Sequence, residues 1–327
     1  MTLSLPRRDL LAAALALPAL ARGAAAQGAF PSRPVRLLVG APPGGAPDVA
    51  ARLMGDALAA RWRQPVVVDN RPAANGNLAA QAAARAEPDG HTLLLAQASI
   101  LVLNEGLMRN VPFDTDRDFA PVSLLMNTPF LLAARPDLPA SNLSELRALA
   151  KERGGRMTFA TSSPVNLPRF AVEMMKAALG FEMGNVPYST TSGALQDTMT
   201  GRTDLVIDGT PVIAPQVRGG QLKALCVTSP ARFPLLEDIP AAAETIPGFS
   251  SMGWFGLVGP KAMPAATVER IAADTRAVLE IPEIRGRLLR DFGAETVASP
   301  PADFARFLAA ERLLYRGLIK EVGASID

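Results

Sequence analysis

The chain has 327 residues, with 33 Lys and Arg against 31 Asp and Glu, one histidine and one cysteine. No Lys/Arg-rich run occurs, which argues against a nucleic-acid partner. A single cysteine excludes an internal disulfide, and one cysteine with one histidine makes a Cys- or His-based metal site or a Cys–His dyad improbable. We therefore predict a protein with neither a bound metal nor a cofactor.

Residues 1–26 have the pattern of an export signal. Two arginines precede an apolar run from Leu10 to Leu20, and three alanines end the segment. That run is too short to cross a bilayer, which needs about 20 apolar residues. The pattern predicts cleavage before Gln27 and a periplasmic location. The arginine pair resembles a twin-arginine signal but departs from it at two positions, so the general secretory route stays open. Without this segment the chain carries 30 basic and 30 acidic residues.

Short apolar runs alternate with helical patterns along the rest of the chain. We expect strands at residues 35–40, 65–69, 92–97, 119–125, 129–134, 157–160, 185–187, 204–208, 222–227, 252–258 and 294–297. We expect helices at residues 47–62, 76–86, 143–152, 168–179, 192–200, 211–218, 264–279, 283–291 and 301–322. This order predicts an α/β fold with mainly parallel, doubly wound sheets. A mature chain of about 300 residues suggests two lobes.

A glycine loop follows the first predicted strand in "VRLLVGAPPGGAPDVAARL". Nucleotide binding is disfavoured, because no Lys or Ser/Thr follows Gly45 and the glycines are wrongly spaced for a dinucleotide motif. A Gly-Gly turn before a helix still offers amides and a helix dipole to an anion. The candidate ligand-binding residues in this loop are Ala41, Pro42, Gly44, Gly45 and Asp48. The alternative for Asp48 is that it only complements the helix dipole.

Three later loops have the same strand–loop–helix layout. Ligands bind outside the carboxyl ends of strands in open α/β sheets, and these loops occupy that position. Ordinary helix capping explains any one of them alone, so the argument rests on their recurrence. The candidate ligand-binding residues are Thr161, Ser162, Ser163 and Asn166 in the first loop, Tyr188, Thr191 and Ser192 in the second, and Asp208 in the third.

Several stretches together resemble the Bug family, the periplasmic solute-binding proteins of tripartite tricarboxylate transporters. They include "FPSRPVRLLVGAPPGGAPDVAARL", "QPVVVDNRPAANGNLAAQAAARAEPDGHTLLLA", "VPFDTDRDFAPVSLL", "VPYSTTSGALQDTMTGRTDLVID" and "GWFGLVGP". The resemblance implies a two-lobed, type II-like Venus-flytrap fold that clamps a small carboxylate through amides and water. It adds Ser99 as a pocket residue and gives Asp208 the role of accepting from a ligand hydroxyl or ammonium. Gly40-Ala41 replaces the family's usual proline and aromatic residue.

The resemblance also implies a domain division and partners. We expect lobe one to comprise residues 27–127 and 250–327 and lobe two residues 128–249, with hinge strands at 119–130 and 252–258. The implied function is capture of a small organic acid by a monomer that presents it to membrane permease subunits, without catalysis. Two alternatives stay open: a ligand sensor for a membrane signalling protein, and an exported hydrolase using Ser162 or Ser163, for which the sequence displays no base.

Overall fold

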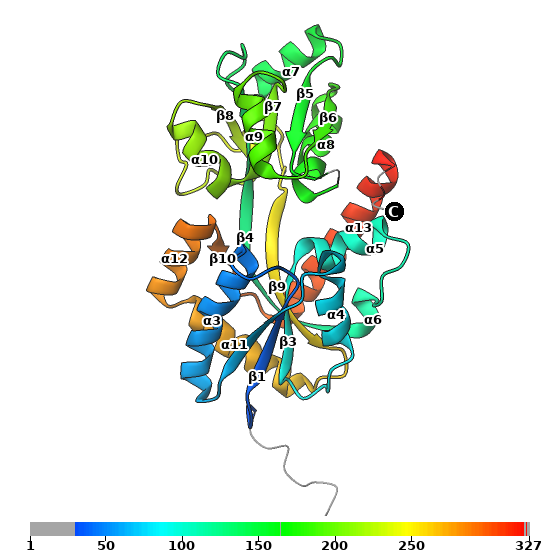
Figure 1. The fold of residues 1–327 in the computed structure, drawn as a ribbon, viewed down its shortest axis with the longest axis vertical. Helices are drawn as coiled ribbons and strands as arrows, with labels where there is room; N and C mark the ends of the chain where they lie inside the picture. Colours follow the sequence, from blue (N-terminus) through cyan, green and yellow to red (C-terminus); the bar gives the residue numbers. More distant parts are fainter. Residues whose placement is uncertain (1–29, 164, 324, 326–327) are drawn as a thin grey trace, which may run out of the picture.

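The computed structural model describes residues 30–163, 165–323 and 325, and these form two lobes joined by two long strands (Figure 1). Strands β4 (Phe119–Ala134) and β9 (Met252–Pro260) pair in antiparallel fashion from Phe119 opposite Pro260 to Pro129 opposite Met252. Beyond that pairing, β4 continues into the second lobe. The sequence predicted two strands in place of β4, but the chain runs through Asn127 without a break because both halves find partner strands.

The first lobe contains a mixed sheet in the order β2-β1-β3-β9-β4, with β10 also paired to β4. Strands β1, β2 and β3 run parallel, and β4 runs in the same direction; β9, which lies between β3 and β4, and β10 run in the opposite direction. Its strands are β1 (Val35–Val39), β2 (Val66–Asn70), β3 (Thr92–Gln97) and β10 (Glu295–Thr296). Its helices are α3 (Ala46–Trp62), α4 (Asn77–Ala84), α5 (Asn104–Leu107), α6 (Thr115–Asp118), α11 (Ala265–Leu279), α12 (Pro282–Phe292) and α13 (Pro301–Val322).

The second lobe repeats this plan around the far half of β4. Strands β5, β6 and β7 are parallel, while β4 pairs antiparallel with β7 and β8. The strands are β5 (Thr158–Thr161), β6 (Gly184–Pro187), β7 (Leu205–Gly209) and β8 (Lys223–Val227). The helices are α7 (Leu143–Glu152), α8 (Leu167–Leu179), α9 (Thr191–Met199) and α10 (Thr210–Arg218). The two-lobed α/β fold is thus confirmed, with mixed rather than mainly parallel sheets because the hinge strands belong to both.

The lobes share one hydrophobic core across the hinge. A single cluster of buried side chains contains Leu94 of β3, Leu132 of β4 and Phe159 of β5. Helix α13 reaches from the first lobe toward the second (Figure 1), where the ring of Tyr315 lies 5.7 Å from that of Phe170 in α8, centroid to centroid. The expected boundaries at residues 127 and 250 stay a prediction.

The sequence missed three short helical segments that border the gap between the lobes or support its walls. A π-helical turn at Ser99–Leu103 leads directly into α5, and α6 follows. Each is too short to display an amphipathic period, so no pattern revealed them.

Within the described residues, no helix combines the length and apolarity needed to cross a membrane. The predicted export signal, residues 1–26, lies outside the described residues. Cys226 is buried in the second lobe as a free thiol, and burial raises its pKa.

Helices α3 and α11 are joined by one buried carboxylate. Asp274, 3% exposed, accepts hydrogen bonds from Trp62 Nε1 at 2.8 Å, Arg61 Nε at 2.6 Å and Arg270 Nε at 2.6 Å. Burial acts to raise the pKa of Asp274, but these donors outweigh it and hold the pKa below its usual value.

We expect Asp274→Ala to lower the free energy of unfolding by about 2 kcal/mol, because it leaves a buried indole N–H unpaired. The depressed pKa means that this contribution is fully present above about pH 4 and is lost as the pH falls through the folded-state value. Urea unfolding at neutral and acid pH measures both effects. Glu269→Gln, on the exposed face of the same helix, is the control and should change little. Equal losses for the two variants would contradict the assignment.

Candidate functional site

A cavity of about 800 Å³ lies between the lobes, with the hinge strands at its base. Loops at the carboxyl ends of β1, β2, β3 and β5, together with the end of β7, supply its walls, as expected for open α/β sheets. Its lining residues are Gly40, Ala41, Pro42, Pro72, Asn75, Gln97, Ala98, Ser99, Leu103, Asn104, Leu107, Thr128, Phe130, Ser162, Ser163, Val165, Asn166, Leu167, Pro168, Asp208, Gly253, Trp254, Phe255 and Ser325.

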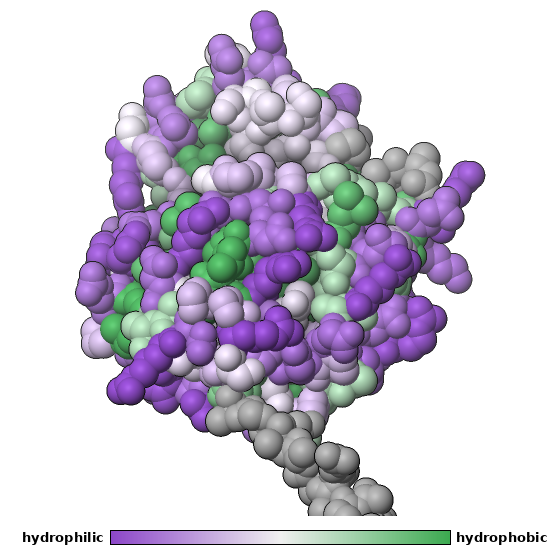
Figure 2. Space-filling model, turned by 60° about the horizontal axis from the view of Figure 1, so that its bottom comes forward, coloured by the Kyte–Doolittle hydropathy of each residue, from purple (hydrophilic) through white to green (hydrophobic). Residues whose placement is uncertain are grey.

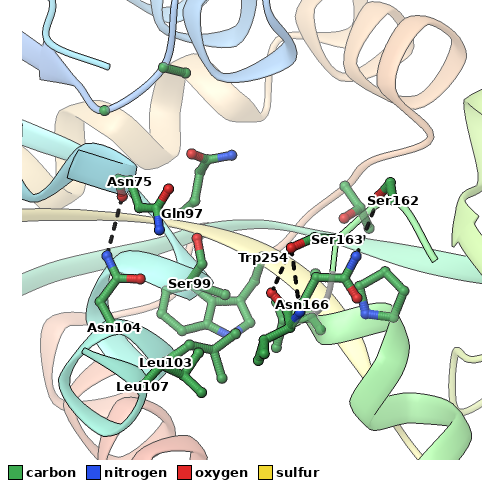
Figure 3. A pocket seen from close by; sticks show the side chains of 18 of the residues that line it. Asn75, Gln97, Ser99, Leu103, Asn104, Leu107, Ser162, Ser163, Asn166 and Trp254 are labelled. Carbon is green, nitrogen blue, oxygen red and sulfur yellow. Dashed lines mark hydrogen bonds between the residues drawn. The ribbon is translucent and has the colours of Figure 1, made fainter. Parts of the chain in front are cut away.

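Close backbone packing brings two loops of the first lobe together at the cavity. A Cβ added at Gly40 would lie 2.8 Å from the Gly76 Cα, and one at Gly76 would lie 2.6 Å from Ile100 Cδ1. Only glycines fit such a contact. Asn75 precedes Gly76 in a left-handed conformation with φ of 53°, one of the few non-glycine residue types that tolerate it. This turn places the Asn75 side chain at the cavity wall (Figure 3).

Three donor-bearing side chains of the first lobe face the cavity: Asn75, Gln97 and Ser99 (Figure 3). We call them the lobe-one donor set. Their side chains make no hydrogen bonds with other described residues. Asn104 beside them is already occupied, because its Nδ2 donates to the Asn75 carbonyl oxygen at 3.2 Å and to Asn77 Oδ1 at 2.6 Å. The donor set can therefore hydrogen-bond an anionic or polar ligand without breaking protein contacts.

The second lobe contributes the loop between β5 and α8. Asn166 caps α8 by accepting the Arg169 N–H at 2.9 Å, and its amide nitrogen donates to Ser162 Oγ at 3.4 Å. Ser163 Oγ donates to the Val165 carbonyl oxygen at 3.2 Å. The Ser162 hydroxyl, an acceptor in its contact with Asn166, keeps its own proton for a ligand.

The base of the cavity is mostly apolar, with Thr128 of β4 as its polar side chain. Leu103, Leu107, Phe130 and Trp254 form what we call the apolar band, and Figure 3 shows the indole lying between the polar groups of the two lobes. Trp254 Nε1 donates to Glu311 Oε2 at 2.8 Å, away from the cavity. Its one polar group is thus used, and the indole offers only apolar surface to a ligand. Burial raises the pKa of Glu311 despite this hydrogen bond.

Asp208 is the one charged residue among the described residues that line the cavity. Its Oδ2 accepts the Thr191 hydroxyl at 2.8 Å, and its Oδ1 accepts the Gly209 N–H at 2.7 Å. No described lysine, arginine or histidine lines the same space. Nor do the described residues contain a cluster of His, Cys, Asp and Glu able to hold a metal ion.

Seven of the predicted ligand-binding residues line this cavity: Ala41, Pro42, Ser99, Ser162, Ser163, Asn166 and Asp208. The other seven do not, and in the glycine loop the reason is internal bonding. Gly44 N–H donates to Asp48 Oδ2 at 2.8 Å, and Gly45 N–H donates to the Pro42 carbonyl oxygen at 3.3 Å. Both amides of the expected anion nest are therefore engaged within the loop. Asp48, 2% exposed, anchors that loop instead of facing a ligand.

The remaining four predicted residues are also placed outside the lining. The Thr161 hydroxyl lies 2.9 Å from the Ser163 carbonyl oxygen and is fully buried. Tyr188 donates its hydroxyl hydrogen to Asp197 at 2.8 Å, and burial together with that carboxylate raises the pKa of Tyr188. Thr191 touches the cavity only through Asp208, and Ser192 is exposed.

Sequence reasoning missed Asn75, Gln97 and the apolar band. One local signal for Asn75 was present, because Asn-Gly in "PAANGN" is typical of a left-handed turn. Gln97 ends a predicted strand at the same sheet edge as the other loops. Trp254 lies inside a predicted strand, and only the tertiary structure shows that this strand forms the base of the cavity.

Fold and cavity together define a two-lobed solute-binding protein. The family model described as tripartite tricarboxylate transporter family receptor matches residues 50–324 of this chain. Protein BugT of Bordetella pertussis is 30% identical, with 91% of each chain covered. The structure of Rpa4515 from R. palustris with adipate has a TM-score of 0.75 and 30% identity, covering 90% of this chain and 99% of that one. MatC from Rhodopseudomonas palustris with bound malate has a TM-score of 0.70 and 30% identity, covering 89% and 100%.

The chain therefore belongs to the tripartite tricarboxylate transporter receptor family, which confirms the resemblance drawn from its motifs. The family consists of periplasmic solute-binding receptors, not enzymes. His91, the only histidine, accepts the Ser32 N–H at 3.1 Å and does not line the cavity.

The anchoring role of Asp48 is testable. Burial acts to raise its pKa, but hydrogen bonds from Arg52, the Gly44 amide and Asn70 outweigh it and hold the pKa below its usual value. We expect Asp48→Asn to cost about 1–3 kcal/mol in unfolding free energy, because the amide cannot accept from all these donors. Chemical denaturation measures the loss. Asp56→Asn, on an exposed face of α3, is the control and should stay within about 0.5 kcal/mol; no difference between the two variants would contradict the anchor.

Proposed function

We propose that this protein captures a small organic carboxylate in the inter-lobe cavity and presents it to the membrane permease subunits of a tripartite tricarboxylate-type transporter. The observation that carries the proposal is the position of the cavity. Donor side chains of both lobes, such as Gln97 and Ser162, meet there above the hinge strands. A ligand that contacts both sets binds the closed arrangement better than an open one, and this differential affinity drives closure.

The chemistry of related structures supports a carboxylate. Rpa4515 is described with adipate and MatC with malate. In this chain, neutral amides and hydroxyls at the cavity are suitable donors to a carboxylate, and hydrogen bonds to a charged group are worth more than neutral ones. The seven predicted residues that line the cavity are our proposed contacts, directly or through water.

We further propose that the protein acts as a monomer in the periplasm, exported by the signal in residues 1–26. The lobe-one face shown in Figure 2 supports the monomer, because hydrophilic side chains cover most of it and apolar ones gather only in small groups. Large contiguous apolar patches are the usual mark of a stable interface.

The lobe-two loop gives a direct test of the proposed site. We expect the double variant Ser162→Ala, Ser163→Ala to weaken binding of the cognate carboxylate about five- to tenfold, because a donor to the ligand is lost. Native mass spectrometry of the purified protein identifies a co-purified acid, and titration calorimetry then measures its affinity. Ser192→Ala, exposed and outside the cavity, is the matched control. Equal affinities in all three proteins would remove this loop from the site.

The alternative of a sensor differs in the partner, not in the cavity. Deleting the genes of tripartite tricarboxylate-type permeases in the source organism and measuring uptake of the identified acid separates the two. Uptake that depends on both the receptor and the permease supports transport. If deleting the gene of this receptor leaves uptake intact but abolishes a transcriptional response to the acid, the sensor is favoured.

A further inference from the structure

The cavity has polar groups at two ends and an apolar base between them. The lobe-one donor set lies at one end, and Ser162, Ser163 and Asn166 lie at the other (Figure 3). The apolar band occupies the space between, and each of its four members is less than 10% exposed. A ligand that fills the cavity places part of its body against this band, where a polar group finds no partner among the four side chains and loses its hydration. The Thr128 hydroxyl on β4 is the polar side-chain group that the hinge strands add to the lining.

The charge balance of the lining limits the charge of the ligand. Asp208 contributes one negative charge, and no described lysine, arginine or histidine compensates it. Each carboxylate that enters leaves water without gaining an ion pair, so a second carboxylate adds cost without a counter-charge. A compact di- or tricarboxylate would also place charge against the apolar band. The lining therefore favours a single carboxylate.

The two ends are not equivalent for that carboxylate. Asp208 belongs to lobe two, on β7, and repels an anion placed near it. The side chains of Asn75, Gln97 and Ser99 present donors that are unused by other described residues. In the second lobe, Asn166 and Ser163 already spend donors on protein oxygens, which leaves the Ser162 hydroxyl as one unused side-chain donor against three in lobe one. The carboxylate is therefore best placed at the lobe-one donor set.

Resting on the proposed function, we propose that the cavity selects a monocarboxylate with an extended or aromatic hydrocarbon body. The lobe-one donor set binds the carboxylate, and the body lies on the apolar band against Trp254. Any further polar group of the ligand is a hydroxyl or ammonium that donates to Asp208. This specificity differs from that of a receptor for compact hydroxy-dicarboxylates.

A matched series of acids tests the ligand class by titration calorimetry on the dialysed wild-type protein. We expect affinity to rise about fourfold for each methylene from butyrate to hexanoate, as burial of hydrocarbon requires. Hexanoate should bind about tenfold tighter than adipate, which has the same chain length and one more charge. If adipate or malate binds tighter than hexanoate, the inference is overturned while the proposed function stands. If no carboxylate binds, the proposed function fails as well.

Two variants test where the carboxylate lies. Asn75→Gly keeps the left-handed turn and Gln97→Met keeps the side-chain volume, but each removes donors. We expect each to weaken hexanoate and butyrate binding about tenfold and equally, because the chain-length dependence comes from the band. Gln81→Met, on α4 and outside the cavity, is the control for the substitution itself. Unchanged affinity in both donor variants would overturn the carboxylate position.

The fluorescence of Trp254 reports where the hydrocarbon body lies, without any change to the lobe-one donor set. The chain has two tryptophans, and Trp62 is not among the lining residues and donates to Asp274. In the Trp62→Phe protein, bound hexanoate should shift or quench the emission of Trp254, since the hydrocarbon body changes the surroundings of the indole. An unaltered emission spectrum at ligand concentrations that saturate the calorimetric signal would overturn the placement of the body.

Discussion

The antiparallel pairing of β4 and β9 is the constraint on which the rest of the structure depends. It extends from Phe119 opposite Pro260 to Pro129 opposite Met252 and gives each lobe a strand that also belongs to the hinge. Each lobe then adds its own parallel strands, and their carboxyl ends face the gap between the lobes. The cavity is a consequence of that arrangement, because loops from two separate sheets converge above one pair of strands.

The hinge strand β9 also fixes the base of the cavity. A Cβ added at Gly256 would lie 2.2 Å from Phe304 Cζ, so glycine at this position lets α13 approach the strand closely. The Trp254 ring then meets Phe304 and Phe307 edge-on, at centroid distances of 5.8 and 5.5 Å. Edge-to-face contacts of this kind hold an aromatic ring in one orientation. The Trp254 ring at the base is therefore held in place, and the donors lie on the loops and strand ends of the two lobes.

Periodicity and turn residues predicted most of the fold, but less of the site. Helix α7 occupies residues 143–152 as expected, because Asn142 and the spacing of Leu143, Leu146 and Ala150 mark it locally. The site depends on contacts that no local pattern encodes. Asn75 reaches the cavity through the packing of Gly40 against Gly76, which are far apart in sequence. The sequence predicts that the amides of the glycine loop bind a ligand, but Asp48 and the Pro42 carbonyl oxygen accept their hydrogen bonds.

Because Asp48 engages the Gly44 amide, the start of α3 is not available as an anion site for the cavity. An acidic residue in the first turn of α3 already neutralises the positive end of that helix, so an anion gains little there. In the site proposed above, neutral side chains such as Gln97 and Ser99 hold the carboxylate, and their individual hydrogen bonds exchange with water at a small net cost. No single bond retains the ligand in such a site; retention requires contacts with both lobes at once. Release to a membrane partner then follows from separating the lobes, without an ion pair to break.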